Sequence, residues 1–283
     1  YLCMYTVPIL TEESMEQRNG RKPLMKKTLT AALCLIMILC LTAGAAAQSA
    51  TPTLDAIKEK GKIIMMTNAT FPPFEYIKDT KFAGIDVDLS QMIADKLGVE
   101  LEVIDMDFGL LIEALKGGKG DFVAAGMTLT EERQEHIDFS MVYITNGLLV
   151  IVPADSSIKS LADLEGKKIA VQEATTGDIW AGEHIKGAVL QQYKGAVEAG
   201  NAVAGGKADA AVMDKLPAES MVKNSGGALA LLEEMAAAED TAMGIAKGKE
   251  DLVAFINEVL KEAIDSGALQ ASIDKHMVEG AGD

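Results

Sequence analysis

The chain has 283 residues, with 26 Lys or Arg against 42 Asp or Glu, and a formal net charge of −16. Residues 1–47 carry five of the basic and three of the acidic residues, so residues 48–283 hold a net charge of −18. A chain this acidic, without a basic stripe, does not suit nucleic acid or an anionic membrane surface, where phosphate charge must be offset. We therefore expect no nucleic-acid partner and an exported, monomeric protein.

The first 47 residues are typical of an export signal preceded by an upstream extension. Met25-Lys26-Lys27 opens a basic region, and residues 29–41 form an uncharged apolar stretch. That stretch is shorter than the about 20 residues that a membrane-spanning helix needs. Small residues then end in Ala45-Ala46-Ala47, which predicts cleavage before Gln48 and a periplasmic mature protein.

Cysteine and histidine usage argues against metal and thiol chemistry. All three cysteines precede the predicted cleavage site, so the mature chain has no thiol for a disulfide, a nucleophile or a zinc site. Cys40 follows Leu39, where lipid attachment needs a small residue, so we expect no lipid anchor. The three histidines lack the paired spacing of metal ligands. We predict no metal and no cofactor.

Apolar runs separated by Gly and Pro predict strands and helices in alternation. We expect strands at 63–66, 100–104 and 122–125, helices at 85–97 and 108–115, and a proline-rigidified loop at 68–76. Further on we expect a crossing strand at 148–152, a helix, turn and strand within 158–172, a helix beginning at 175–178, a returning strand at 241–246 and an amphipathic helix at 252–264. The order predicts an α/β fold of two lobes, the first from 48–149 plus 243–283 and the second, inserted, from 150–242.

One short unit occurs twice. Residues 114–121 read ALKGGKGD and residues 202–209 read AVAGGKAD, and an apolar stretch follows each. Each unit indicates a helix end, a Gly-Gly stop and a buried strand, which is the helix-to-strand half of a parallel α/β unit. Ligands of open α/β sheets bind beyond the carboxyl ends of strands. The first strand leads to Arg133 and the second to Asp214, a cation and an anion that together suit a small zwitterion.

Seven motifs then follow one another in an order that resembles a known family. They are TNATFPPFE at 67–75, GIDVDL at 84–89, MDF at 106–108, AGMTLTEER at 125–133, IDFS at 137–140, TTGD at 175–178 and DAAVMD at 209–214. Over about residues 61–276 the chain resembles the extracellular solute-binding proteins for polar amino acids, the periplasmic receptors of ATP-binding-cassette (ABC) importers. The resemblance implies two lobes that close by a hinge motion on a free L-amino acid and deliver it to a membrane permease, without catalysis.

The same resemblance implies a ligand role for eight residues. Arg133 matches the clamp for the α-carboxylate, which a planar guanidinium fits with two parallel hydrogen bonds. Asp214 matches the partner of the α-ammonium group. The other six are Gly126 and Thr128 for the amino and carboxylate groups, Thr176 for its backbone N–H to the carboxylate, Phe71 and Phe108 as aromatics around the ligand side chain, and Asn68 at the side-chain end.

The ligand side chain is the open question. Asn68, Gln172 and Met213 are uncharged where relatives selective for particular amino acids carry an acid, a base or a histidine, so we expect a polar uncharged ligand. A basic amino acid such as arginine or lysine remains an alternative, with Glu75 or Asp86 as counter-charge. A second alternative is an enzyme on the same fold, similar to periplasmic cyclohexadienyl dehydratases, and a third is the sensor module of a receptor.

Overall fold

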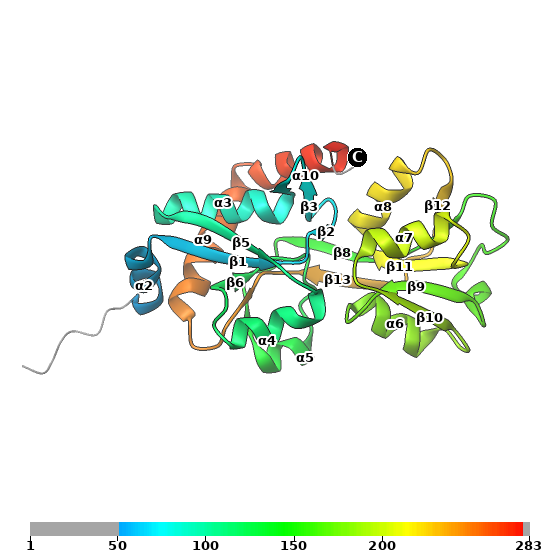
Figure 1. Ribbon diagram of the computed structural model, residues 1–283, viewed down its shortest axis with the longest axis horizontal. Helices are drawn as coiled ribbons and strands as arrows, with labels where there is room; N and C mark the ends of the chain where they lie inside the picture. Colours follow the sequence, from blue (N-terminus) through cyan, green and yellow to red (C-terminus); the bar gives the residue numbers. More distant parts are fainter. Residues whose placement is uncertain (1–50, 280–283) are drawn as a thin grey trace, which may run out of the picture. The chain divides into compact units, whose positions relative to one another are not determined.

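The computed structural model describes residues 51–279, so the predicted signal peptide and its cleavage site lie outside the described residues. The first of its two larger sheets has the strand order β5-β1-β6-β14-β7 (Figure 1). β1 (Lys62–Thr67) lies between two parallel neighbours, β5 (Glu100–Asp105) and β6 (Phe122–Val123). β14 (Gly244–Ile245) is antiparallel both to β6 and to β7 (Asp138–Phe139). A small antiparallel sheet joins β2 (Thr70–Phe71), β3 (Glu75–Lys78) and β4 (Lys81–Ala83).

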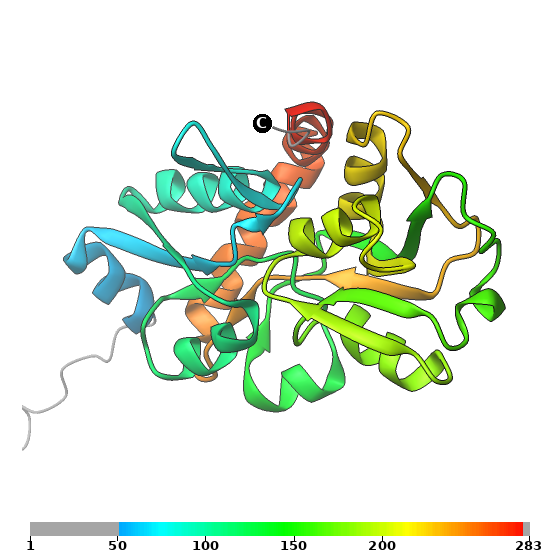
Figure 2. The ribbon, with the colours of Figure 1, turned by 45° about the vertical axis from the view of Figure 1, so that its right-hand side comes forward.

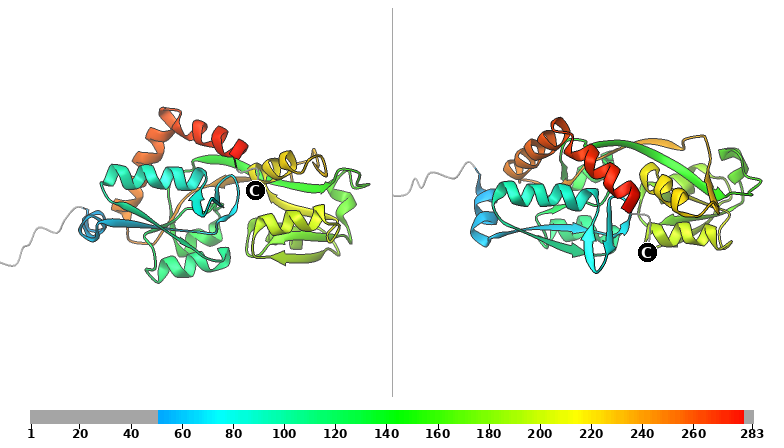
Figure 3. Two further views of the ribbon diagram at one scale, coloured as in Figure 1. Left: turned by 45° about the horizontal axis from the view of Figure 1, so that its top comes forward. Right: turned by 90° about the horizontal axis from the view of Figure 1, so that it is seen from above.

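The second large sheet has the order β10-β9-β11-β8-β12, and β13 pairs with β8 as well. Its strands are β8 (Ile144–Pro153), β9 (Lys168–Gln172), β10 (Val189–Tyr193), β11 (Ala210–Asp214), β12 (Leu229–Leu231) and β13 (Ala237–Thr241). The chain passes from the first sheet to the second through β8 and comes back through β13 (Figure 3). This is the two-lobed α/β fold predicted from the sequence, while the lobe boundaries at 149/150 and 242/243 stay predictions.

Helices cover both faces of each sheet, as expected where parallel strands are buried on both sides. In the first lobe these are α2 (Pro52–Lys60), α3 (Ile85–Leu97), η3 (Phe108–Leu110), α4 (Leu111–Lys116), α5 (Glu131–His136), α9 (Glu250–Asp265) and α10 (Ala268–Glu279) (Figure 2). In the second they are η4 (Leu161–Leu164), α6 (Thr176–His184), α7 (Ala196–Ala204) and α8 (Lys215–Asn224). Alternate residues of β11 face opposite cores: Val212 packs with Ala181 of α6, and Ala211 packs with Ala199 of α7.

Three elements differ from the sequence expectation. The helix expected at 108–115 begins with the 3-10 turn η3, which contains the poor helix former Gly109. The helix expected after residue 158 is only the 3-10 turn η4, opened by a capping box of Ser160 and Asp163. The returning strand expected at 241–246 is divided, because β13 pairs with β8 of one sheet whereas β14 pairs with β6 and β7 of the other.

The two copies of the repeated unit form the same local structure. Asp121 Oδ2 accepts a hydrogen bond from the backbone N–H of Ile64 on β1 (2.7 Å), and Asp209 Oδ2 accepts one from Lys168 on β9 (2.8 Å). Each aspartate therefore ties the start of the new strand to its parallel neighbour. As a result β6 and β11 are placed alike in their sheets, and the residues that follow them lie at the carboxyl ends of strands.

Candidate functional site

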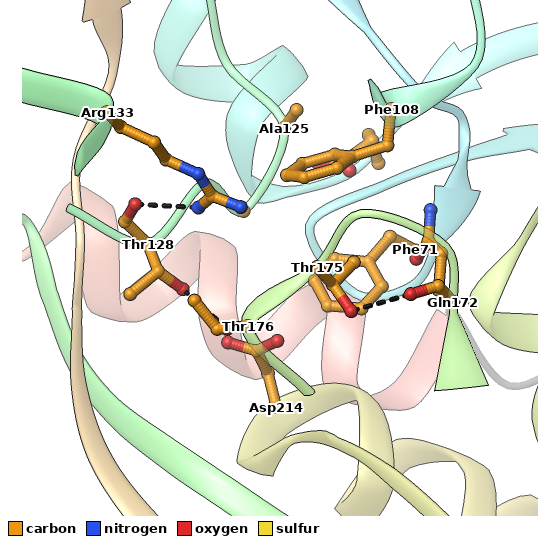
Figure 4. A pocket seen from close by; sticks show the side chains of 11 residues that line it. Phe71, Phe108, Ala125, Thr128, Arg133, Gln172, Thr175, Thr176 and Asp214 are labelled. Atoms are coloured by element: carbon orange, nitrogen blue, oxygen red, sulfur yellow. Dashed lines mark hydrogen bonds between the residues drawn. The ribbon is translucent and has the colours of Figure 1, made fainter. Parts of the chain in front are cut away.

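A cavity with about 270 Å³ of atom-free space lies beyond the carboxyl ends of β6, β9 and β11 (Figure 4). It is lined by Phe71, Glu75, Phe108, Ala125, Gly126, Thr128, Arg133, Gln172, Thr175, Thr176 and Asp214. Every predicted site residue except Asn68 is in this lining. Both lobes contribute to it, so the structure brings together the residues that follow the two copies of the repeat.

Arg133 is held at the cavity wall by its own helix and by both lobes. Its backbone N–H donates to the side chain of Thr130, the N-cap of α5. Its Nη1 donates to the carbonyl oxygen of Thr128 (2.8 Å), and its Nη2 donates across the cleft to that of Ala174 (3.3 Å). The guanidinium lies over the Phe108 ring, 5.2 Å from its centroid, a cation–π geometry. These contacts fix the guanidinium plane through neutral acceptors, and the carboxyl groups of Glu239 and Asp214 lie within electrostatic reach of its positive charge.

Asp214 ends β11 inside the cavity wall and is only 4% exposed. Its Oδ1 atom has no hydrogen-bond partner among the described residues. Burial raises its pKa well above the usual value and the charge of Glu239 raises it further, while Arg133 lowers it. Burying a carboxylate oxygen without a hydrogen-bond donor costs free energy. A ligand cation would supply both the missing donor and a charge of opposite sign.

The Gly126 backbone is positioned by a buried carboxylate behind the cavity. Its N–H donates to Asp86 Oδ2 (2.8 Å), while the Tyr143 hydroxyl donates to Asp86 Oδ1 (2.6 Å). Burial raises the pKa of Asp86 to about 6 against the lowering effect of these two donors. Gly126 has φ +53°, and a Cβ atom there would come within 2.7 Å of a Phe71 ring carbon. Only glycine therefore fits between Asp86 and the aromatic wall.

Glu75 lines the cavity but is almost completely buried. Neither of its carboxylate oxygens has a hydrogen-bond partner among the described residues. Burial raises the pKa of Glu75 well above its usual value, and the charge of Asp86 raises it further. This shift favours the neutral carboxyl group, and an approaching cation would favour the ionised form.

Asn68 lies beside the cavity and not in its lining. Its Nδ2 donates to the carbonyl oxygen of Met106 (2.9 Å), and its Oδ1 accepts from Thr70 Oγ1 (2.7 Å) and from Gln172 Nε2 (2.8 Å). The last bond joins the two lobes, as does the ion pair of Lys194 with Asp107 on the rim (3.2 Å). The side chain of Asn68 is thus engaged with protein groups, and its predicted ligand role stays a prediction.

Sequence reasoning did not identify one residue next to the cavity, Glu239 on β13. Its Oε2 atom accepts a hydrogen bond from Thr128 Oγ1 (3.0 Å), and Thr128 Oγ1 lies 3.4 Å from Thr176 Oγ1. Glu239 belongs to none of the motifs, and its proximity follows from the pairing of β13 with β8, which the sequence does not specify. Ala125, Gln172 and Thr175 line the cavity as well. No ligand role was predicted for these three residues.

A second, larger hollow adjoins the first and shares Phe108, Arg133 and Thr176 with it. Trp180 and His184 of α6 line it, with their rings stacked 5.1 Å apart. Among residues 51–279 no cluster of side chains is suited to holding a metal ion. No helix in the same range has the length and apolar character needed to cross a membrane.

Comparison with known proteins agrees with this architecture. The "Arginine-binding extracellular protein ArtP" of Bacillus subtilis (strain 168) is 35% identical over 255 residues, covering 87% of this chain and 96% of that protein. The crystal structure of the P235GK mutant of ArgBP from T. maritima is 36% identical with a TM-score of 0.75, covering 80% of this chain and 99% of that one. The ancestral amino-acid-binding protein AncCDT-1, described as a precursor of cyclohexadienyl dehydratase, is 33% identical with a TM-score of 0.75 and the same coverage. Residues 63–279 match the bacterial extracellular solute-binding proteins, family 3, and the chain belongs to that family.

Proposed function

We propose that this protein binds a free L-amino acid in the cavity and delivers it to the permease of an ABC importer. The observation that carries the proposal is the placement of Arg133 and Asp214, a buried cation from one lobe and a buried anion from the other, in the wall of one small cavity. Charges buried this far from water need partners of opposite sign. The two ends of an amino-acid zwitterion supply both at once.

In this proposal the α-carboxylate lies against Arg133, the Thr128 hydroxyl and the N-terminus of α6 at Thr176. The first N–H groups of a helix are without internal partners and favour a negative charge. The α-ammonium lies against Asp214 and the carbonyl oxygen of Gly126. Phe71 and Phe108 then flank the ligand side chain. Asn68 acts indirectly, by holding Gln172 in the cavity wall.

Lobe closure belongs to the proposal because the site is complete only when the lobes meet. Arg133 to Ala174, Asn68 to Gln172 and Asp107 to Lys194 are all contacts between the lobes. The two connecting strands, β8 and β13, would act as the hinge. Ligand binding then favours the closed form, because only that form lets both ends of the zwitterion be held.

Two side-chain classes remain as candidates. A polar uncharged side chain suits the neutral groups of Gln172, Thr175 and the aromatic walls. A basic side chain is favoured by Glu75, whose two oxygens are without donors, and by the arginine-binding relative ArtP. Glu75 would lose its proton when a guanidinium or ammonium group arrives.

A calorimetric comparison of arginine with citrulline distinguishes the two classes, because citrulline replaces the guanidinium by a neutral urea of nearly the same shape. If Glu75 is the counter-charge, arginine binds much more tightly, and Glu75→Gln removes most of the difference. If the site takes uncharged side chains, citrulline or glutamine equals or exceeds arginine. Failure of all twenty amino acids to raise the melting temperature or to bind would reject the proposed function itself.

Binding without turnover is part of the proposal. AncCDT-1 is itself named as an amino-acid-binding protein, and Arg133 with Asp214 suits retention of a zwitterion. Incubation with prephenate and arogenate at saturating concentration tests this directly. We expect no aromatic product above the uncatalysed rate, and steady product formation would establish a dehydratase.

Export to the periplasm is proposed as well. The intact mass of the mature native protein should correspond to a chain that begins at Gln48 and carries no lipid adduct.

A further inference from the structure

Glu239 is a second carboxylate beside the proposed ammonium site, and no role has been assigned to it above. It lies on β13, one of the two strands that connect the lobes, and it is partly buried. Its Oε2 accepts the hydroxyl hydrogen of Thr128 at 3.0 Å. It therefore contacts one lining residue directly, although it is not itself in the cavity lining.

Strand pairing places Glu239 on the same face of the second sheet as Asp214. On β8, Leu148 is opposite Asp214 of β11, and Asn146, two residues earlier, is opposite Glu239 of β13. Side chains two residues apart on a strand point to the same face. The two carboxyl groups thus lie on either side of β8, above the same short stretch of backbone.

The electrostatic environment shows that these carboxyl groups interact. Burial raises the pKa of Asp214 and the Glu239 charge is the next largest cause. Burial also raises the pKa of Glu239, whereas Thr176, Thr128 and Arg133 lower it. Two carboxylates with only one cation between them cannot both be ionised cheaply in a site shielded from water. One shared proton brings the charge of this group, with Arg133, to zero.

We propose that Glu239 is a positioning residue that shares one proton with Asp214 in the unliganded protein, so that capture of the ligand ammonium releases this proton to solvent. This inference rests on the proposed function. The ammonium of the ligand takes the place of the proton as the positive partner of the Asp214 and Glu239 carboxylates. Only an O–H bond is broken, and the proton passes to the buffer.

The other charged groups near the pair do not replace Glu239 in this role. Arg133 of α5 faces both carboxyl groups and keeps its charge throughout the range of interest. Glu75 of β3 and Tyr143 both lie within electrostatic reach of Asp214. Burial raises the pKa of each, which favours the neutral form of both groups. Asp86 of α3 accepts hydrogen bonds from Gly126 and Tyr143.

The sign of the pH dependence follows from these shifts. In the unliganded protein the pair keeps a proton up to its raised pKa, and the bound ammonium lowers that pKa. Affinity therefore rises with pH between the pKa of the pair in the liganded protein and its pKa in the unliganded protein. The rise is up to about tenfold per pH unit for one linked proton, and above the unliganded pKa the affinity is constant. Removing the Glu239 charge lowers the unliganded pKa of Asp214 and moves the whole profile to lower pH.

Titration calorimetry from pH 4.5 to 8, in buffers of different ionisation enthalpy, measures the protons released per ligand. We expect wild-type protein to release up to one proton per ligand at the acidic end and to bind more weakly there. Glu239→Gln should release fewer protons at each acidic pH and should retain its affinity to lower pH. The ligand for this test should be a neutral amino acid bound by the wild type, so that Glu75 is not titrated by a ligand cation.

Asp240→Asn is the matched control, because it makes the same charge change on the neighbouring, exposed residue of β13, whose side chain bonds Thr145. This variant should keep the wild-type profile. The inference is overturned if wild-type protein binds the ligand with no proton release at any pH, or if Glu239→Gln and wild type give superimposable profiles. The wild-type measurement decides the question even if Glu239→Gln does not fold. An absence of amino-acid binding by wild type would instead reject the proposed function.

Discussion

Gln172 Nε2 donates a hydrogen bond of 2.8 Å to Asn68 Oδ1, and this bond joins the end of β9 in one lobe to the loop after β1 in the other. Both side chains are buried, at 5% and 6% exposure. A hydrogen bond that exists only when the lobes meet stabilises the closed form alone. If the lobes open and close as proposed, we therefore expect the Asn68–Gln172 hydrogen bond to favour the closed form that binds the ligand.

Asn68→Ala should weaken ligand binding by roughly fivefold, because a buried neutral hydrogen bond contributes about 1 kcal/mol. Calorimetry gives the affinity, and urea unfolding shows how much of the effect is general destabilisation. Gln91→Ala, which removes an exposed amide bonded to Asp95 within α3, serves as the control and should bind as wild type does. Equal affinities for Asn68→Ala and wild type would show that the Asn68–Gln172 hydrogen bond does not stabilise the closed form.

Gly126→Ala should abolish measurable binding or weaken it more than tenfold. The added Cβ would meet the Phe71 ring at 2.7 Å, and the residue would be in the left-handed region at φ +53°. Gly118→Ala is the matched control, since Gly118 has φ +71° with open space around its Cβ position. Both variants bear a similar backbone strain of about 1 kcal/mol, so only Gly126→Ala should lose affinity. Comparable losses in both would mean that strain, and not the cavity wall, is responsible.

Glu75→Gln should affect stability in a pH-dependent way. Burial raises the folded-state pKa of Glu75 above its unfolded value. Above the unfolded pKa of about 4.3, the unfolded chain therefore loses this proton more readily than the folded protein, and the wild-type free energy of unfolding falls as the pH rises. Glutamine is neutral in both the folded and the unfolded state, so Glu75→Gln removes this pH dependence. Urea unfolding from pH 4.5 to 8 should therefore show the variant gaining stability relative to wild type as the pH rises. A difference that stays constant over this range would mean that Glu75 does not titrate as described.

Ligand binding should change the emission of Trp180, the single tryptophan of the chain. Trp180 lines the hollow next to the cavity, stacked on His184, where lobe movement alters its surroundings. X-ray scattering provides the independent check, since closure on a ligand reduces the radius of gyration. Saturable binding with no compaction would contradict the hinge mechanism, whatever the fluorescence does.

The sequence predicted the fold, and most of the predicted residues line the cavity, because both depend on local signals. Gly-Gly stops and apolar runs determine where α4, α7, β6 and β11 begin or end, and the residues after each strand are then at its carboxyl end. Pairing across the lobes is not local. Asn68 bonds Gln172, a contact between residues 104 positions apart, while its expected contact with the ligand stays a prediction. Glu239 reaches Thr128 over 111 positions, and only the register of β13 on β8 shows it.

A matched set of variants and ligand analogues tests whether Arg133 and Asp214 hold opposite ends of one zwitterion. Losing one partner of a buried charged pair costs about 2–5 kcal/mol, so each alanine variant should bind roughly 30-fold to several thousand-fold more weakly. Arg133→Lys should recover only part of the loss, because an ammonium cannot make two parallel hydrogen bonds to a carboxylate.

The measurement is calorimetry of wild type, Arg133→Ala and Asp214→Ala with the preferred amino acid, its decarboxylated analogue and its deaminated analogue. Removing the α-carboxylate should weaken binding greatly in wild type but little in Arg133→Ala. Removing the α-amino group should weaken binding greatly in wild type but little in Asp214→Ala. We predict that the effects of the protein change and the ligand change are non-additive in these two matched combinations alone. Equal losses in every combination would show that the two residues stabilise the fold and do not contact the ligand.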